Sequence, residues 1–240
     1  MTIDKLMGRT PGLVGAGWDE CMASLDGRTI IDVGANTGDF TAVFLNHGAH
    51  VIAIEPGPKL AEGLRTRFAG DSRVVVRQVG LSDAPGRLEG VQFHNCWTLA
   101  KPGQFATKRI GSVSPGAAEI EGDGTFDVDL TTLDAVVEGD VGFVKIDADG
   151  YEPNILRGAT RTLTAIRPPM LIELSYVPQD MGESIEEFIA GIYRAGYVLA
   201  TLDGYRTTET QVLEHFPWHT SLDMLMMPVE RARHWPEIIP

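Results

Sequence analysis

The feature that most limits the possible folds of this chain is a regular alternation of short apolar runs with amphipathic stretches. Apolar, β-branched runs of this length predict buried strands, and apolar residues three or four positions apart predict the helices between them. A chain that alternates in this way forms a mostly parallel sheet with helices on both faces. The predicted strands are residues 29–33, 51–54, 73–79, 142–146, 170–174, 197–202 and 222–227.

Two segments depart from the alternation. Residues 86–128 are irregular and rich in glycine, and we interpret them as an insertion of short antiparallel pieces that binds substrate. Residues 1–28 precede the first strand and are expected to form a helical cap, so that residues 29–240 make one α/β domain. Near the end of this domain, Ser184 followed by Glu187 predicts a capping box at the start of a helix.

The composition limits the classes of partner and the compartment. The 240 residues carry a formal net charge of −13, so a partner with a phosphate backbone is not expected. Cys21 and Cys96 lack zinc-binding spacing and are expected to be reduced thiols. Neither a secretory leader nor a membrane-spanning run is recognisable, so we expect a cytoplasmic protein that does not bind membranes. Because symmetric dimers are common, a homo-oligomer stays among the expectations.

The strongest functional signal is the segment DVGANTG at residues 32–38, which follows a predicted strand and opens a helix. Gly34 and Gly38 allow the backbone to approach a ligand closely, and a helix N-terminus favours anionic groups. Glu55 ends the next predicted strand, where a carboxylate can accept hydrogen bonds from both hydroxyls of a ribose. The pattern therefore predicts a site for a nucleoside cofactor.

Two cofactor classes fit a glycine turn followed by an acidic residue. A dinucleotide site requires G-x-G-x-x-G because a pyrophosphate presses against the backbone, and Asn36 stands here in place of the middle glycine. S-adenosylmethionine (SAM) has no pyrophosphate, and Asp32 at the strand end suits its cationic amino-acid portion. The sequence also lacks a Tyr-x-x-x-Lys pair. We therefore favour a methyltransferase and keep an NAD-dependent oxidoreductase as an alternative.

An ordered series of motifs resembles the FkbM-type methyltransferases. The motifs are IDVGANTG (31–38), VIAIEP (51–56), VGLSD (79–83), TLD (132–134), VKIDADGYE (144–152) and ILRGA (155–159).

This resemblance, which runs from about residue 30 to residue 175, implies the class I methyltransferase fold. That fold has a seven-stranded mixed sheet with the order 3-2-1-4-5-7-6 and an antiparallel last strand. The resemblance also implies O-methylation of a sugar, a saccharide or another natural product, and it adds Pro56, Gly80 and Leu81 to the SAM site. Asp149 departs from the glutamate that is usual in the family, although a carboxylate is retained.

Carboxylates follow the predicted strands on the acceptor side. Asp147 and Asp149 lie just past the fourth main strand, and Glu173 lies near the end of the fifth. Ligands of open α/β sheets bind at this edge, so the three side chains are expected to converge there, with Asp147 also next to the cofactor. Asp147 and Glu173 are candidate ligands for Mg²⁺, and Asp147 or Asp149 is a candidate base. The competing interpretation is that Glu173 pairs with Lys145.

Histidine is the usual general base near neutral pH, and two of the six histidines are candidates. His94 ends a strand that enters the insertion, and His219 precedes the final strand. Among methyltransferases the alternative acceptor is a nitrogen of a small molecule. The Asn/Asp-Pro-Pro-Tyr/Phe tetrapeptide associated with such N-methylation is absent after the fourth strand, which favours a hydroxyl acceptor.

Overall fold

The computed structural model describes residues 15–93, 99–100, 126–175, 182–216 and 221–238. Seven strands form one large sheet: β1 (Thr29–Val33), β2 (His50–Ile54), β3 (Val74–Arg77), β8 (Val141–Ile146), β9 (Met170–Ser175), β10 (Tyr197–Ala200) and β11 (Ser221–Pro228).

The order of these strands is β3-β2-β1-β8-β9-β11-β10. The strands from β3 to β9 pair in parallel, whereas β11 is antiparallel to both β9 and β10. This arrangement confirms the class I fold and the strand order expected from the sequence. The parallel pairs also bring the carboxyl ends of β1, β2, β8 and β9 to one edge of the sheet.

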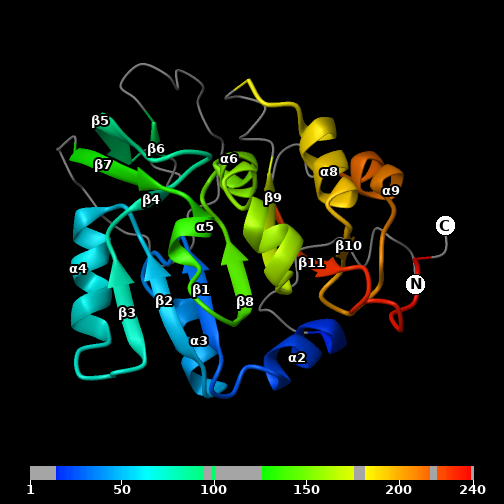
Figure 1. The fold of residues 1–240 in the computed structure, drawn as a ribbon, viewed down its shortest axis with the longest axis horizontal. Coiled ribbons are helices and arrows are strands. Elements are labelled where there is room, and N and C mark those ends of the chain that lie inside the picture. The colour runs from blue at the N-terminus through cyan, green and yellow to red at the C-terminus, as the bar shows by residue number, and fades with distance from the viewer. Residues whose placement is uncertain (1–14, 94–98, 101–125, 176–181, 217–220, 239–240) are drawn as a thin grey trace.

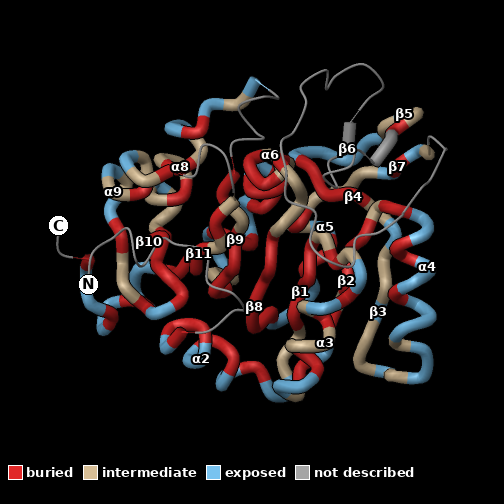
Figure 2. The backbone as a smooth tube through the Cα atoms, turned by 180° about the vertical axis from the view of Figure 1, so that it is seen from behind, coloured by how far each residue is buried: buried red, intermediate tan, exposed pale blue. Residues whose placement is uncertain are grey.

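Helices cover both faces of the large sheet. One face carries α5 (Leu133–Val136), α6 (Glu152–Arg157), a π-helical turn (Thr162–Ile166), α8 (Ile185–Arg194) and α9 (Glu209–Glu214). The other carries α2 (Ala16–Ala23), α3 (Asp39–Asn46) and α4 (Pro58–Arg67). Figure 2 shows the central strands buried between these layers. Such burial on both faces explains the continuous apolar runs of the sequence, because a strand covered on one side alternates apolar and polar residues.

A smaller sheet is built from the margins of the predicted insertion. It consists of β4 (Gly80–Leu81), β5 (Gly86–Phe93), β6 (Leu99–Ala100) and β7 (Phe126–Thr131), in the order β4-β7-β5-β6. β5 runs antiparallel to β7 and to β6. Figure 1 shows the small sheet beyond the end of the large sheet toward which the arrowheads of β3 and β8 point. The small sheet thus lies next to the edge of the large sheet at which a ligand is expected.

Helix α2 packs on the same face of the large sheet as α3. Trp18 packs against Phe44 and Phe143, with ring centroids 6.4 and 6.0 Å away. Cys21 on the same helix is buried, and burial raises the pKa of its thiol to about 12, which suits an inert structural residue. No helix in the described part of the chain is long and apolar enough to cross a membrane.

One local prediction is half right. The Ser184 side chain accepts a hydrogen bond from the Glu187 backbone N–H, as expected at a helix start. The Glu187 carboxylate pairs with Arg194 instead of closing a capping box, because a charged partner lies two turns along the same helix. A complete capping box forms between Thr208 and Gln211 at the start of α9.

Candidate cofactor and acceptor site

The glycine turn after β1 is shaped by close contact with the neighbouring strand. Gly34 has φ +71°, and a Cβ at this position would lie 1.8 Å from the backbone oxygen of Asp147. Only glycine combines this conformation with this approach. The N–H groups of Gly34 and Ala35 both donate to the Ile54 carbonyl at 3.0 Å, so the turn is also held to the end of β2.

Glu55 is fixed by the backbone of the two loops beside it. The Asn36 N–H donates to its Oε2 at 2.9 Å, and the Gly57 N–H donates to its Oε1 at 2.8 Å. Burial raises the pKa of Glu55, and these two N–H groups oppose the rise. Each oxygen accepts one bond and retains acceptor capacity, so a ribose with two hydroxyls fits the orientation of this carboxylate.

The other predicted cofactor residues support the same loops. Gly38 begins α3 with φ +89°, and a Cβ there would lie 2.6 Å from the Phe68 ring of the α4 region. Gly80 and Leu81 form β4, which pairs with β7 of the small sheet. Pro56 is half-buried beside Glu55. The assignment of these four residues to the SAM site stays a prediction.

Asp32 lies deeper than the sequence analysis anticipated. Its carboxylate is fully buried and accepts a hydrogen bond from the Thr41 hydroxyl at 2.6 Å. Burial raises the pKa of Asp32, while Lys145 and the Thr41 hydroxyl lower it. Because no part of Asp32 is exposed, its carboxylate has no free surface for a cofactor, and a role in the SAM site stays a prediction.

Lys145 joins the cofactor loop to the first acceptor-side carboxylate. Its Nζ lies 2.8 Å from the Gly34 carbonyl oxygen and 3.2 Å from Asp147 Oδ2. The side chain of Asp147 is 35% exposed, so it remains open to a ligand. The expectation that Lys145 pairs with Glu173 is therefore replaced by pairing with Asp147.

Glu173 and Asp223 face each other across the antiparallel pair β9 and β11. Burial, followed by the charges of Asp147 and Asp149, raises the pKa of Glu173 well above its usual range. Burial and Asp147 raise the pKa of Asp223 to about 6, against the effect of Lys145. Sequence reasoning missed Asp223, although one signal marks it: a carboxylate interrupts the otherwise apolar run of β11.

The loop after β8 is tightened by an internal carboxylate. Glu152 is fully buried and accepts hydrogen bonds from the N–H groups of Ala148, at 2.7 Å, and Gly150, at 2.9 Å. Burial raises the pKa of Glu152 to about 7. Asp149 adopts φ +49°, a left-handed conformation that aspartate tolerates better than most residues. This loop therefore holds Asp147 and Asp149 in a fixed turn.

The structure does not test the two candidate histidines and does not complete the predicted metal site. His94 and His219 lie outside the described residues. Within the ranges described above, no group of three or more histidine, cysteine, aspartate or glutamate side chains is arranged to hold a metal ion. The Asp147 and Glu173 pair thus lacks a third such ligand among these residues.

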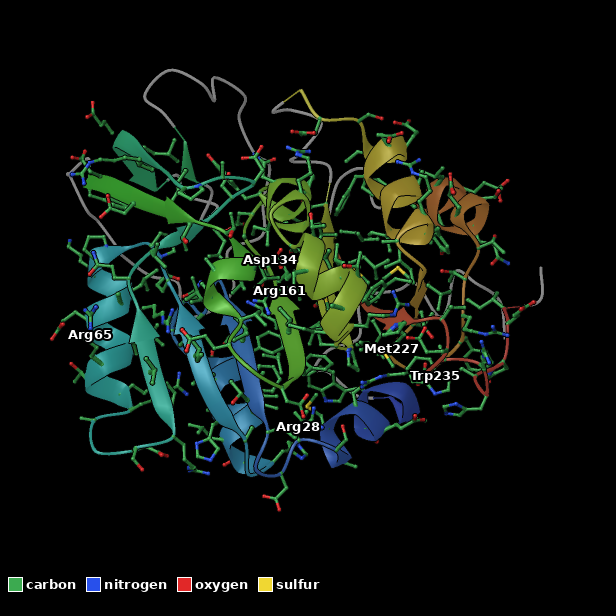
Figure 3. The ribbon with its side chains drawn as sticks, in the orientation of Figure 1. Arg28, Arg65, Asp134, Arg161, Met227 and Trp235 are labelled. Carbon is green, nitrogen blue, oxygen red and sulfur yellow. The ribbon has the colours of Figure 1, made fainter. Side chains whose placement is uncertain are left out.

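Asp134 of the TLD motif binds residues that lie just after the ILRGA motif. Asp134 Oδ1 accepts hydrogen bonds from the N–H and hydroxyl of Thr162 at 2.8 and 2.7 Å, and Oδ2 accepts the Arg161 N–H at 2.7 Å. The Arg161 guanidinium donates a hydrogen bond to the Asp134 backbone carbonyl at 2.6 Å. Figure 3 shows the two labelled residues beside each other at α5. A Cβ on Gly158 would lie 2.2 Å from the Ser82 carbonyl, which ties the same region to β4.

The sheet order, the glycine turn and the acidic residue after β2 define a class I methyltransferase. A family model described as the methyltransferase FkbM domain matches residues 32–199. This chain belongs to the FkbM methyltransferase family.

One of the solved structures compared with this chain supports the fold. A putative rRNA methylase from Clostridium thermocellum has a TM-score of 0.50 at 10% identity, over 92% of this chain and 97% of that one. A methyltransferase FkbM from Methylobacillus flagellatus has a TM-score of 0.49 at 18% identity, over 85% of this chain. A putative methyltransferase from Streptococcus mutans, in complex with S-adenosylhomocysteine (SAH), has a TM-score of 0.46 at 11% identity, over 87% and 93%. This chain spans 47% of the FkbM structure's length. No curated relative matches the sequence.

Proposed function

We propose that this chain transfers the methyl group of SAM to a hydroxyl of a sugar, a saccharide or another natural product. The observation that carries the proposal is the position of Asp147. Its carboxylate is 35% exposed, and its backbone oxygen touches the Gly34 turn that is expected to hold SAM. A hydroxyl acceptor loses a proton during methylation, and a carboxylate beside the methyl donor can accept it or orient the hydroxyl.

The protein has two tasks in such a reaction. SAM is already a reactive methyl donor, so the site must align the acceptor oxygen with the methyl carbon and manage the proton. Glu55 and the glycine turn are suited to hold the nucleoside, because the Glu55 oxygens are fixed by backbone N–H groups. Acceptor oxygens for the hydroxyls of a polar substrate come from four carboxylates, those of Asp147, Asp149, Glu173 and Asp223.

The same carboxylates help to compare a hydroxyl acceptor with an amine or a nucleic acid. N-methylation of a small molecule is the runner-up, and a cationic amine would be attracted to the same side chains. The lack of the Pro-Pro tetrapeptide after β8 favours a hydroxyl. An acidic chain with acidic acceptor groups disfavours nucleic acid as substrate and favours a small molecule or saccharide.

The proposed reaction does not include magnesium. Asp147 already has Lys145 as a cationic partner at 3.2 Å, and the described residues offer no three-ligand group. The residues that the structure describes do not fit a magnesium site, and no step of the proposed reaction uses one. Chelation followed by addition of Mg²⁺ tests this directly. Recovery of activity with Mg²⁺ would mean that residues outside the described ranges complete a site.

The deciding experiment is a transfer screen with methyl-labelled SAM over hydroxylated sugars, polyketides and matched amines. We expect labelled product from a hydroxylated acceptor, and a rise in melting temperature with SAH but not with NAD, since a ligand that binds the folded state stabilises it. Labelled product from the amines alone would replace O-methylation by N-methylation. Stabilisation by NAD without stabilisation by SAH would overturn the methyltransferase proposal as a whole.

A further inference from the structure

Lys145 is the buried cation at the centre of the site. It lies in β8 between β1 and β9, and its side chain is 2% exposed. Its Nζ reaches the carbonyl oxygens of Val33 at 3.1 Å and Gly34 at 2.8 Å. The same atom lies 3.2 Å from Asp147 Oδ2 and 3.7 Å from Asp32 Oδ1.

This environment keeps the ammonium group charged. Burial lowers the pKa of Lys145. The negative charges of Asp147 and Asp32 raise it by more, so the net shift of the pKa is upward. The Phe40 ring adds a cation–π contact, with its centroid 5.0 Å from Nζ. A charged ammonium has three N–H donors, and two carbonyls and one carboxylate stand within hydrogen-bonding distance of it.

Those partners belong to different parts of the site. Val33 and Gly34 form the turn assigned to the cofactor, and Asp147 is the exposed carboxylate assigned to the acceptor. A shift of Lys145 would move both, because the Gly34 turn already presses against the Asp147 backbone. Asp32, which is buried, supplies the counter-charge that keeps the lysine in this place.

We propose that Lys145 is a positioning residue that couples the cofactor turn to the acceptor carboxylate. The ammonium holds the Val33 and Gly34 carbonyls away from the ligand side and orients Asp147 toward the acceptor. This inference rests on the proposed function, since it assigns SAM to the turn and a hydroxyl acceptor to Asp147. It goes further by giving a role to a residue that touches neither ligand.

The test compares Lys145→Met with Asp147→Asn in the full chain. We expect Lys145→Met to weaken SAH binding on the order of ten-fold, because the turn loses its anchor, whereas Asp147→Asn changes it less than about two-fold. With the acceptor from the transfer screen, both variants should lower kcat. The two losses of kcat should not multiply in the double variant, because both act through Asp147.

Loss of the fold is separated from loss of coupling by two further variants. Phe143→Leu, two residues earlier in β8 and buried against Trp18, weakens the core without touching the turn and should leave SAH affinity unchanged. Asp32→Asn combined with Lys145→Met removes both buried charges, so that neither is left uncompensated. We expect this pair to melt cooperatively and still to bind SAH weakly.

Wild-type SAH affinity in either Lys145→Met variant, or kcat losses that multiply, would overturn the coupling role. These failures differ from failure of the proposed function, in which the wild-type chain itself binds no SAH. A chain in which neither lysine variant melts cooperatively while Phe143→Leu does would show a role in folding and overturn the coupling role equally.

Discussion

The cofactor side and the acceptor side of the strand-end edge are built on different principles. On the cofactor side, both oxygens of Glu55 accept backbone N–H groups within 2.9 Å. On the acceptor side, Glu173 and Asp223 stand opposite each other, and burial together with nearby negative charge raises the pKa of both. On the first side the protein fixes the carboxylate and leaves each oxygen able to accept a further bond, whereas the second side concentrates charges of one sign.

This difference indicates what each side contributes. A carboxylate held by backbone loops presents one geometry, which suits a ligand that is always the same, such as a cofactor. Carboxylates that oppose one another are stabilised by a proton, a cation or polar hydrogens from a ligand. Lys145 stands at the boundary and neutralises part of the acceptor side while bonding to the cofactor turn.

The largest expected effect comes from Gly34→Ala, which affects both sides together. The new Cβ would lie 1.8 Å from the Asp147 backbone oxygen and would add the strain of φ +71°. We expect a loss of several kcal/mol in the free energy of unfolding, together with loss of SAH binding. Gly70→Ala is the matched control, because its φ is +86° with nothing within 4 Å. Equal melting temperatures for the two variants would show that the close contact is unimportant.

The next effect isolates the acceptor side. Asp147→Asn removes the charge but keeps the shape, so we expect turnover to fall by roughly 10²-fold or more while SAH binding is retained. Steady-state kinetics and calorimetry measure the two quantities. Asp140→Asn, at the opposite end of the same strand and exposed, should change neither. Full activity in Asp147→Asn would show that the acceptor binds elsewhere.

The cofactor side is isolated by Glu55→Ala. The change removes the carboxylate and leaves the N–H groups of Asn36 and Gly57 without this partner. We expect SAH binding to weaken by about 1–3 kcal/mol, measured by calorimetry. Glu62→Ala, an exposed glutamate on α4, should bind SAH like the wild type. Unchanged affinity in Glu55→Ala would place the nucleoside away from β2.

The fourth expected effect is a pH dependence of stability from the loop that holds Asp147 and Asp149. Burial raises the pKa of Glu152 from 4.5 to about 7, so the folded chain binds more protons than the unfolded chain within this range. The contribution of Glu152 to stability should therefore fall as the pH rises from about 4.5 to about 7, and it should be constant above that. Urea unfolding of the wild type and of Glu152→Gln across this pH range measures the difference between their free energies of unfolding. If burial does not raise the pKa of Glu152, this difference should not change with pH in this range.

Much of the molecule could be predicted from local sequence. Each predicted strand of the large sheet has a counterpart in the structure, because burial on both faces requires a continuous apolar run. Gly34 and Glu55 could be found because each follows a strand directly, and a parallel sheet brings such strand ends to one edge. The strand order came from the family resemblance, and the structure confirms it.

What only the tertiary structure decided is the pairing of charges. The sequence allowed Lys145 to pair with Glu173, but the register of β1 against β8 places Lys145 beside Asp32, and its Nζ reaches Asp147. Asp223 joins the acceptor side because β11 runs antiparallel to β9 and sets it opposite Glu173. Apolar periodicity determines which residues are buried, since burial depends on each residue's own chemistry. It does not determine which buried charges meet, because that depends on the register between strands that are far apart in the chain.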